Sequence, residues 1–351
     1  MADVVFILDG TGEHHLLLMR FLKKYLGEER CRFFFCGVSC NPSKIAEDEN
    51  AEVVPSFLKP PTKVSHLLAA CRRIVVVGLF DPGLVAYLNM HRGLLGKTAV
   101  AFHGGEFYGM RGKMSWKMHV FHCAKRLIVS KMKACYTFTP DDYIFAKDYF
   151  LLPKEHGYVE LPWHFDIGPE RALLEKPHDP AIIMVGHNAH PEGHHQEILE
   201  SLARYKDENI RILAPLSYGP KENREDVIAC GKRIFGDKFD PLLTWIEPEK
   251  YQRLLQSVSV FAMGIDRQAG TFNLNLMLRL GCKVYARTDT SLWSYFTGYC
   301  ACALFDIDSI SRTSFDDFVS FSQEDRRLNS ESMSRTLTPD QCLKSWEAVL
   351  D

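Results

Sequence analysis

Residues 181–197 read AIIMVGHNAHPEGHHQE, and residues 258–274 read VSVFAMGIDRQAGTFNL. In both stretches a short apolar run of strand length ends in a polar, glycine-containing loop, and helix-like sequence follows. In an open parallel sheet such loops lie at the carboxyl ends of the strands, beside helix N-termini whose N–H groups attract anions. The two stretches therefore predict a parallel α/β domain with its ligand at these loops. Residues 210–219, IRILAPLSYG, predict a further strand that ends in a tight turn.

The rest of the chain repeats this alternation of short apolar runs and segments of helical length, which is typical of parallel α/β structure. Strands are predicted at 4–8, 32–38, 73–79, 98–102, 134–138 and 158–161, and then at 181–185, 210–214, 242–246, 258–263, 283–286 and 301–305. Residues 162–180 hold four prolines and mixed charge, which favours a linker. We therefore expect an N-terminal domain over 1–162, a linker over 163–180, a C-terminal domain over 181–335 and a terminal helix within 336–351.

Composition limits the class of protein. The 351 residues suffice for two domains, and 46% hydrophobic with 25% charged residues is ordinary for a globular protein. The net charge of −2 provides no overall field for nucleic acid. No apolar run approaches the length of a membrane span, and the first residues lack a signal peptide, so a cytoplasmic protein is expected. The 11 cysteines form no C-x-x-C pair, which favours reduced core thiols.

Four motifs of the second half resemble a known family. The loop after 185 resembles a Gly-Asn-Ser-Ala-x-Pro-x-Asn-x-His-x-Glu type loop, 215–219 is an intact Pro-Leu-Ser-Tyr-Gly, and 231–242 resembles a segment with a Pro-Leu pair. The matching positions are Gly186, Ala189, Pro191, His195 and Glu197, then Glu249 and Tyr251 of a Glu-Tyr helix, and Arg267, Gln268 and Asn273 of an Arg-Gln-Gln type loop. On these residues the chain resembles the bacterial N-acetylfucosaminyltransferases that act on a lipid-linked disaccharide, the 4-alpha-L-fucosyltransferases of glycosyltransferase family 56.

The first half matches the family only at 103–108, HGGEFY, which resembles a Trp-Gly-Gly-Asp-Leu-Tyr turn. Departures from the family pattern are His187, Asn188, Ala269, Phe272 and Glu106. They bear on which sugar is used. The reaction class rests on the order and spacing of the motifs, which the chain keeps.

The resemblance implies the GT-B fold, two Rossmann-like domains facing across a cleft, with the donor on the C-terminal domain and the acceptor on the N-terminal domain. It implies a fucose-type deoxy or acetamido-deoxy sugar, a nucleotide-sugar co-substrate that is TDP-linked, with GDP and UDP also open, and no metal or other cofactor. The acceptor would be a lipid-linked or other glycan in bacterial surface polysaccharide synthesis.

Glycosyl transfer leaves negative charge on the departing diphosphate, and cationic side chains or helix N-termini can neutralise it. Arg267 is the expected catalytic cation. The residues expected to bind the donor nucleotide-sugar are Gly186, His187, His195, Tyr218, Gly219, Trp245, Tyr251, Arg267, Gln268 and Asn273. If the stereochemistry inverts, a base must take the acceptor proton, and Glu106 is the first candidate, with His103 second.

Other interpretations remain open. Arg267 could pair with Asp266, Glu106 could cap a helix, and Trp245 and Tyr251 could be core residues. The histidines from His187 to His195 could hold the metal of a hydrolase, or the protein could be a non-catalytic two-domain sugar-binding protein.

Residues 111–133 are basic, with Met114, Met118, Phe121 and Leu127 loosely on one side. This pattern favours a surface helix in peripheral contact with an anionic membrane, on the inner face of the cytoplasmic membrane, over a merely solvated face.

Overall fold

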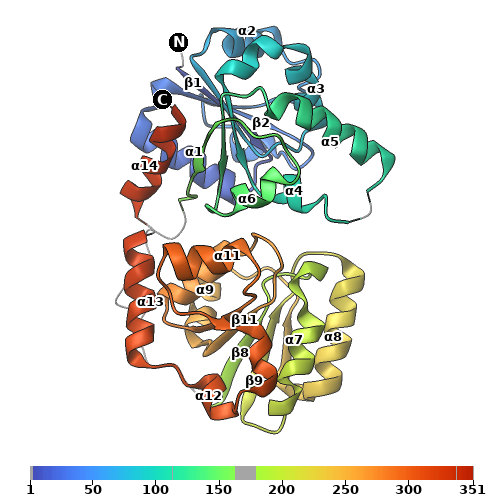
Figure 1. Ribbon diagram of the computed structural model, residues 1–351, viewed down its shortest axis with the longest axis vertical. Coiled ribbons are helices and arrows are strands. Elements are labelled where there is room, and N and C mark those ends of the chain that lie inside the picture. The colour runs from blue at the N-terminus through green and yellow to red at the C-terminus, as the bar shows by residue number, and fades with distance from the viewer. Residues whose placement is uncertain (1–2, 113, 163–178, 337, 351) are drawn as a thin grey trace. The chain divides into compact units, whose positions relative to one another are not determined.

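The computed structural model describes residues 3–112, 114–162, 179–336 and 338–350. The chain divides into two compact units, Met1–Trp163 with Thr338–Asp351, and His164–Leu337 (Figure 1). Most of the predicted linker, 163–178, lies outside the described residues.

The first unit is built on a parallel sheet of seven strands in the order β3-β2-β1-β4-β5-β6-β7. These strands are β1 Val4–Asp9, β2 Cys31–Cys36, β3 Ala51–Val53, β4 Arg73–Val77, β5 Thr98–Phe102, β6 Ala134–Thr137 and β7 Glu155–Tyr158. Strand β1 pairs with both β2 and β4, so the strand order reverses beside β1. All residues of β4 and β5 are buried, which accounts for the apolar runs that follow Arg73 and Thr98.

The helices of this unit are α1 Glu13–Leu26, α2 Thr62–Ala70, α3 Pro82–Met90, α4 Gly105–Tyr108, α5 Trp116–Val129, α6 Asp142–Lys147 and the chain-terminal α14 Pro339–Leu350. Helix α14 is the helix expected within 336–351, and it belongs to the first unit. Its Trp346 is fully buried, meets Phe6 edge to face, and donates from Nε1 to the Glu160 carbonyl at 2.7 Å. The C-terminal helix thus completes the core of the first unit.

The second unit is built on a parallel sheet of six strands in the order β10-β9-β8-β11-β12-β13. The strands are β8 Ala181–Val185, β9 Ile210–Pro215, β10 Phe239–Leu242, β11 Val260–Met263, β12 Lys283–Ala286 and β13 Phe305–Asp306. The helices are α7 His195–Leu202, α8 Lys221–Phe235, α9 Pro248–Ser257, α10 Thr271–Arg279, α11 Ser291–Ser294, α12 Phe315–Val319 and α13 Gln323–Thr336. The order reverses between β8 and β11, which in such sheets is where ligands bind.

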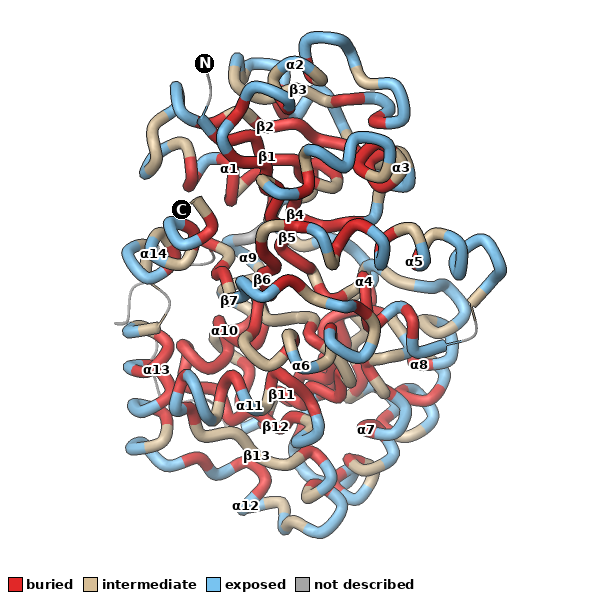
Figure 2. Tube along the Cα trace, turned by 45° about the horizontal axis from the view of Figure 1, so that its top comes forward, coloured by how far each residue is buried: buried red, intermediate tan, exposed pale blue. Residues whose placement is uncertain are grey.

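This sheet has a core on each face, and alternate residues of one strand enter each. Ile183 and Val185 join the core under α7 and α8, whereas Met184 joins the core under α9, α10 and α13. Figure 1 shows α7 and α8 on one side of the sheet with α9 and α13 on the other, and Figure 2 shows the strands as mainly buried.

The central strands lie where the sequence predicts them, and edge strands are displaced. The strands predicted at 158–161, 242–246 and 301–305 correspond to β7, β10 and β13, whose observed bounds are shifted by several residues from the predicted ones. Strand β3 and helix α2 were not predicted. Each misplaced strand lies at an edge of its sheet, so most of its residues are exposed or only partly buried. An edge strand does not need a continuous apolar run, and the nearby apolar residues misled the prediction.

Candidate active site

A pocket of about 280 Å³ lies beside the loops that follow strands β8, β9 and β10. It is lined by His187, Pro215, Ser217, Tyr218, Leu242, Thr244, Trp245, Ile246, Tyr251, Phe272 and Asn273. Five of the residues predicted to bind the donor, namely His187, Tyr218, Trp245, Tyr251 and Asn273, therefore lie around one cavity. Trp245 is 70% exposed, so it forms a wall of the pocket and is not a core residue.

Two glycines let the loops of this pocket approach each other. Gly186 has φ +66°, and a Cβ there would collide with the His195 ring. Gly219 has φ +119°, and its Cβ would lie 2.7 Å from the carbonyl carbon of Ala189. The backbone N–H of Ala189 donates to the Tyr218 carbonyl at 2.8 Å, which ties the β8 loop to the β9 loop. Both predicted glycines are needed, because the His195 ring occupies the space of a side chain at Gly186 and the Ala189 backbone occupies it at Gly219.

The hydrogen bonds around His187 determine which ring nitrogen carries its proton. Asn188 Oδ1 accepts from the backbone N–H of His190 at 2.8 Å, so its Nδ2 is the group that faces His187 Nε2 at 2.7 Å. His187 Nε2 therefore accepts, and Nδ1 carries the hydrogen. The pKa of His187 falls to about 3, mainly because the ring is buried. The nearby His195, Arg267 and His190 lower it further. The ring is a neutral donor, and its buried Nδ1 has no hydrogen-bond partner among the described residues.

The start of helix α10 lies against the same ring. Gly270 has φ +67°, and a Cβ on it would lie 3.0 Å from His187 Nδ1. The N-cap Gly270 has no side chain to cap the helix, so the positive end of the helix dipole faces this ring. Asn273 in that turn accepts a hydrogen bond at Oδ1 from the Tyr251 hydroxyl at 3.1 Å, and Gln268 is buried just before it. A neutral imidazole N–H and a helix N-terminus thus meet beside the pocket.

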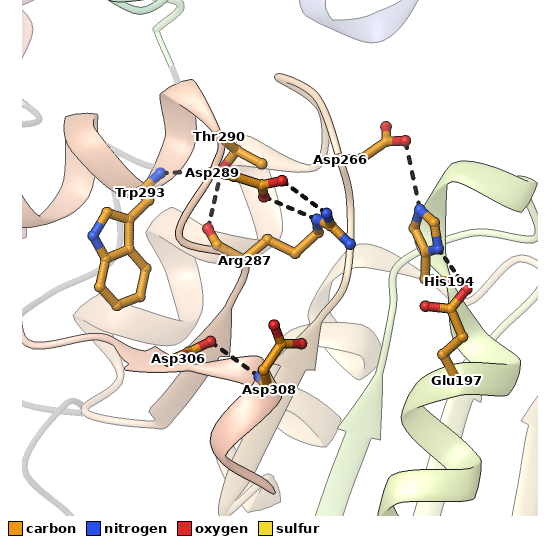
Figure 3. A network of polar contacts seen from close by, with 9 residues as sticks. All are labelled: His194, Glu197, Asp266, Arg287, Asp289, Thr290, Trp293, Asp306 and Asp308. Atoms are coloured by element: carbon orange, nitrogen blue, oxygen red, sulfur yellow. Dashed lines mark hydrogen bonds and ion pairs between the residues drawn. The ribbon is translucent and has the colours of Figure 1, made fainter. Parts of the chain in front are cut away.

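Arg267 does not line the pocket, but it lies close enough for its charge to lower the pKa of His187. Its Nε is 3.8 Å from Glu192 Oε1 in the β8 loop, and its side chain is 24% exposed. The alternative partner Asp266 instead contacts His194 Nε2 at 3.5 Å, and His194 Nδ1 contacts Glu197 at 3.0 Å (Figure 3). Arg267 is therefore held at the junction of the β8 and β11 loops.

The four histidines from His187 to His195 have different surroundings. His187 faces the pocket, His190 lies 3.9 Å from Glu192, and His194 bridges Asp266 and Glu197. His195 is buried beneath Gly186 and Gly193, and burial lowers its pKa to about 4. Within the described parts of the chain, these four do not form a group that could hold a metal ion. The geometry does not support the metal-dependent hydrolase.

Glu106 and His103 differ in accessibility. Glu106 is fully buried, and its Oε1 accepts from the backbone N–H of Leu79 at 2.9 Å. Burial raises its pKa, although the nearby Lys125 opposes this. The carboxylate therefore supports the turn after β4 and cannot reach an acceptor in this conformation. His103 is partly exposed, so it is the better placed of the two candidates.

His103 also has neighbours that the sequence did not single out. His14 and His15, in the first turn of α1, surround it, and His15 Nε2 lies 2.8 Å from His103 Nε2. The sequence does hold one signal for this cluster, which is a pair of adjacent histidines directly after the glycine-containing loop of the first strand.

Comparison with known proteins fits this geometry. The model of one family, 4-alpha-L-fucosyltransferase glycosyl transferase group 56, matches residues 64–327. The chain belongs to this family. It is thus a glycosyltransferase of polysaccharide synthesis, as the resemblance implied.

Solved structures confirm the GT-B fold of this glycosyltransferase. The lipopolysaccharide outer core galactosyltransferase WaaB has a TM-score of 0.71 at 10% identity, with 99% of this chain and 98% of WaaB covered. The trehalose 6-phosphate synthase of Burkholderia multivorans has a TM-score of 0.67 at 11% identity, with coverages of 100% and 98%. An Escherichia coli structure described as trehalose-6-phosphate bound with UDP-2-fluoro glucose has a TM-score of 0.67 at 10% identity, with coverages of 99% and 98%.

Proposed function

We propose that this glycosyltransferase moves a fucose-type deoxy or acetamido-deoxy sugar from a nucleoside diphosphate to a lipid-linked or other glycan acceptor of a bacterial surface polysaccharide. The family supports the sugar class. The observation that carries the donor assignment is the pocket itself, where an aromatic wall lies next to a helix N-terminus and a neutral histidine donor.

The donor fits this pocket in a definite orientation. Trp245 and Tyr251 offer apolar ring surface for the nucleoside, which matches the amphipathic character of a base and ribose. The diphosphate then lies at the first turn of α10, where the positive end of the helix dipole favours negative charge and His187 Nδ1–H donates to it. On donor binding, Arg267 moves from Glu192 to the diphosphate. The diphosphate carries two negative charges and attracts the guanidinium more strongly than one partly exposed carboxylate does.

This arrangement neutralises the leaving group with groups of the chain alone. None of the described residues that line the pocket is a carboxylate, the ligand that Mg²⁺ requires beside a diphosphate. We therefore propose a donor half-reaction without metal, in which cationic and N–H donors stabilise the charge that develops as the glycosidic bond breaks. The acceptor binds the first unit, at the carboxyl edge of its sheet, where His103 is within reach and Glu106 is not.

Donor binding is tested first. A thermal-shift series would compare TDP, UDP, GDP and their fucose-type sugar conjugates, since a ligand that binds only the folded state stabilises it by about 2.7 kcal/mol at one hundred times its Kd. One nucleoside diphosphate should raise the melting temperature without added metal, with TDP expected. The assignment fails if no nucleotide shifts the melting temperature, or if a shift requires a divalent cation.

We also propose that α5 places the enzyme on an anionic membrane surface. Trp116, Val120 and Leu127 lie on one helix face and are 72%, 59% and 54% exposed. Lys117 and Arg126 flank this face and are exposed. Met114 and Phe121 of the predicted stripe pack instead against the core of the unit, because the helix turns Ile128 and Val129 inward. Exposed apolar residues with basic neighbours match an interfacial helix.

Vesicle flotation tests the membrane proposal. Among the residues that the structure describes, no helix has both the length and the apolar character to cross a bilayer, so the contact would be peripheral. Vesicles with anionic lipid should float the protein, and a Trp116→Ala, Val120→Ala double variant should lose most of the floated fraction. Leu151→Ala is the matched control because Leu151 is 78% exposed outside α5. Equal flotation of both variants would refute the role of α5.

A further inference from the structure

Three histidines converge at the carboxyl edge of the first unit's sheet. His14 and His15 follow β1, and His103 follows β5. Their ring centroids are 4.1 Å (His14 to His15), 5.3 Å (His14 to His103) and 4.9 Å (His15 to His103) apart. One ring nitrogen of each lies within 4.8 Å of the other two, and no other group of the described residues meets this condition for a metal ion.

The hydrogen bonds turn two of these nitrogens toward each other. His15 Nδ1 lies 2.9 Å from the Gly10 carbonyl, which can only accept, so Nδ1 carries the hydrogen of His15. His15 Nε2 is then an unprotonated acceptor, and His103 Nε2 donates to it across 2.8 Å. A histidine that ligates a metal typically anchors its second nitrogen on a backbone carbonyl in this way.

The surroundings suit a metal centre as well. The His103 ring is stacked with Phe138 at 4.9 Å and Phe80 at 6.4 Å, which fixes its orientation. His15 is buried, whereas His14 and His103 are partly exposed, so an ion could enter from solvent.

We propose that His14, His15 and His103 bind one divalent transition-metal ion of the zinc class through one nitrogen each, with a fourth position open. Zinc–nitrogen bonds of about 2.0–2.1 Å in tetrahedral geometry place ligand nitrogens roughly 3.3 Å apart, so the two Nε2 atoms need to separate only slightly. On binding, the His103 proton moves from Nε2 to Nδ1 and the ring stays neutral. Three imidazoles favour zinc over Mg²⁺ or Ca²⁺, which prefer oxygen ligands.

The open position gives the ion a role in glycosyl transfer, namely activation of the acceptor hydroxyl. This role, unlike metal binding itself, rests on the proposed function. Three protein ligands with one open position are the arrangement of catalytic zinc sites. An acceptor hydroxyl bound there would pass its proton to solvent water more readily, because the ion stabilises the resulting oxygen anion. His103 would then act on the acceptor through the ion. The donor pocket, in the other unit, keeps its own metal-free chemistry.

Metal binding is measured on the full chain without a polyhistidine tag, after removal of metal by chelator and dialysis. Calorimetric titration with Zn²⁺ should give one equivalent, and Co²⁺ should give the visible absorption of a tetrahedral ion. His15→Ala and His103→Gln should each weaken binding by at least about tenfold. His190→Ala and His194→Ala are matched controls from the other histidine-rich loop and should bind like the wild type.

Two results would overturn the proposal. One is a wild type that binds no Zn²⁺ or Co²⁺. The other is binding that survives in His15→Ala and His103→Gln but is lost in the His190 or His194 variant, which would move the ion to the β8 loop. Melting curves confirm that each variant is folded. Stabilisation by nucleoside diphosphates is scored separately, so failure of the metal site and failure of the donor assignment are distinguishable.

Discussion

Gly219 shows how one missing side chain shapes the donor pocket. Its φ of +119° and the 2.7 Å between a Cβ and the Ala189 backbone leave no room for alanine. We expect Gly219→Ala to cost about 1–3 kcal/mol of stability and to raise the KM for the donor, because the loop carrying His187 must move. Gly236→Ala is the control, since Gly236 has φ +57° but open space around its Cβ. Denaturation and donor kinetics measure both effects, and a normal KM in Gly219→Ala would contradict this account.

Arg267 is expected to matter for turnover and hardly at all for folding. Its pair with Glu192 is 3.8 Å long and partly exposed, and such pairs contribute about 0–1 kcal/mol. Loss of one charge from the leaving group costs about 10²–10³ in turnover at comparable sites. Arg267→Ala should therefore keep its melting temperature and lose at least about a hundredfold in kcat. Arg211→Ala removes a surface arginine that pairs with Asp240, and it should leave kcat unchanged. Near-normal turnover in a folded Arg267→Ala would exclude Arg267 from the reaction.

At the residue scale, the residues predicted for the donor lie together around one pocket, whereas the two predicted for the acceptor differ in burial. His187, Tyr218 and Asn273 each follow a strand of one parallel sheet, and the carboxyl ends of those strands meet at one edge. Glu106 also follows a strand, but tertiary packing turns its carboxylate into the interior. Whether a polar side chain faces solvent or core is decided by contacts with distant residues. One sequence does not show those contacts.

At the scale of elements, Trp346 makes helix α14 part of the first unit's core. Its fully buried indole packs on Phe6 and donates to the Glu160 carbonyl. Replacement of such an aromatic by alanine costs about 3–5 kcal/mol, so Trp346→Ala should markedly lower the denaturant midpoint. Trp245→Ala is the control, because Trp245 is 70% exposed. It should leave stability nearly unchanged and weaken nucleotide binding. Equal stability of the two variants would show that α14 is not part of this core.

Elements were predictable to the extent that burial appears in the local sequence. The predictions at β5, β8 and β12 have the observed bounds because these strands are buried and carry apolar runs. The sheet edge β10 contains Pro241, which an edge strand tolerates because one side of it is unpaired. The attachment of α14 to the first unit could not be predicted, since its sequence shows one apolar face and not what that face packs against.

On the scale of the whole molecule, buried histidines and a buried glutamate give opposing dependences of stability on pH. In the second unit, the pKa values of His187 and His195 fall to about 3 and about 4. Between those values and pH 6.5, the two histidines are protonated in the unfolded chain and neutral in the folded chain. They therefore make the free energy of unfolding rise with pH. Their effect is complete above pH 6.5.

Glu160 of the first unit has the opposite sign. Burial raises its pKa from 4.5 to about 7, and neither carboxylate oxygen has a hydrogen-bond partner among the described residues. Between pH 4.5 and 7 the folded chain keeps a proton that the unfolded chain releases, so stability falls as pH rises through this window. Above pH 7 the full cost of the buried charge, up to about 3 kcal/mol, is present.

Glu160→Gln removes this charge and leaves the histidine contribution in place. Compared with the wild type, the variant should have nearly equal stability at pH 4.5 and should be more stable by as much as about 3 kcal/mol at pH 8. Urea denaturation at pH 4.5, 6 and 8 measures the difference, with the exposed Glu347→Gln as the matched control. A gain that is the same at all three pH values would mean that the amide packs better and that no charge was relieved. A gain that grows with pH, and only in Glu160→Gln, would show that the carboxylate ionises inside the folded core.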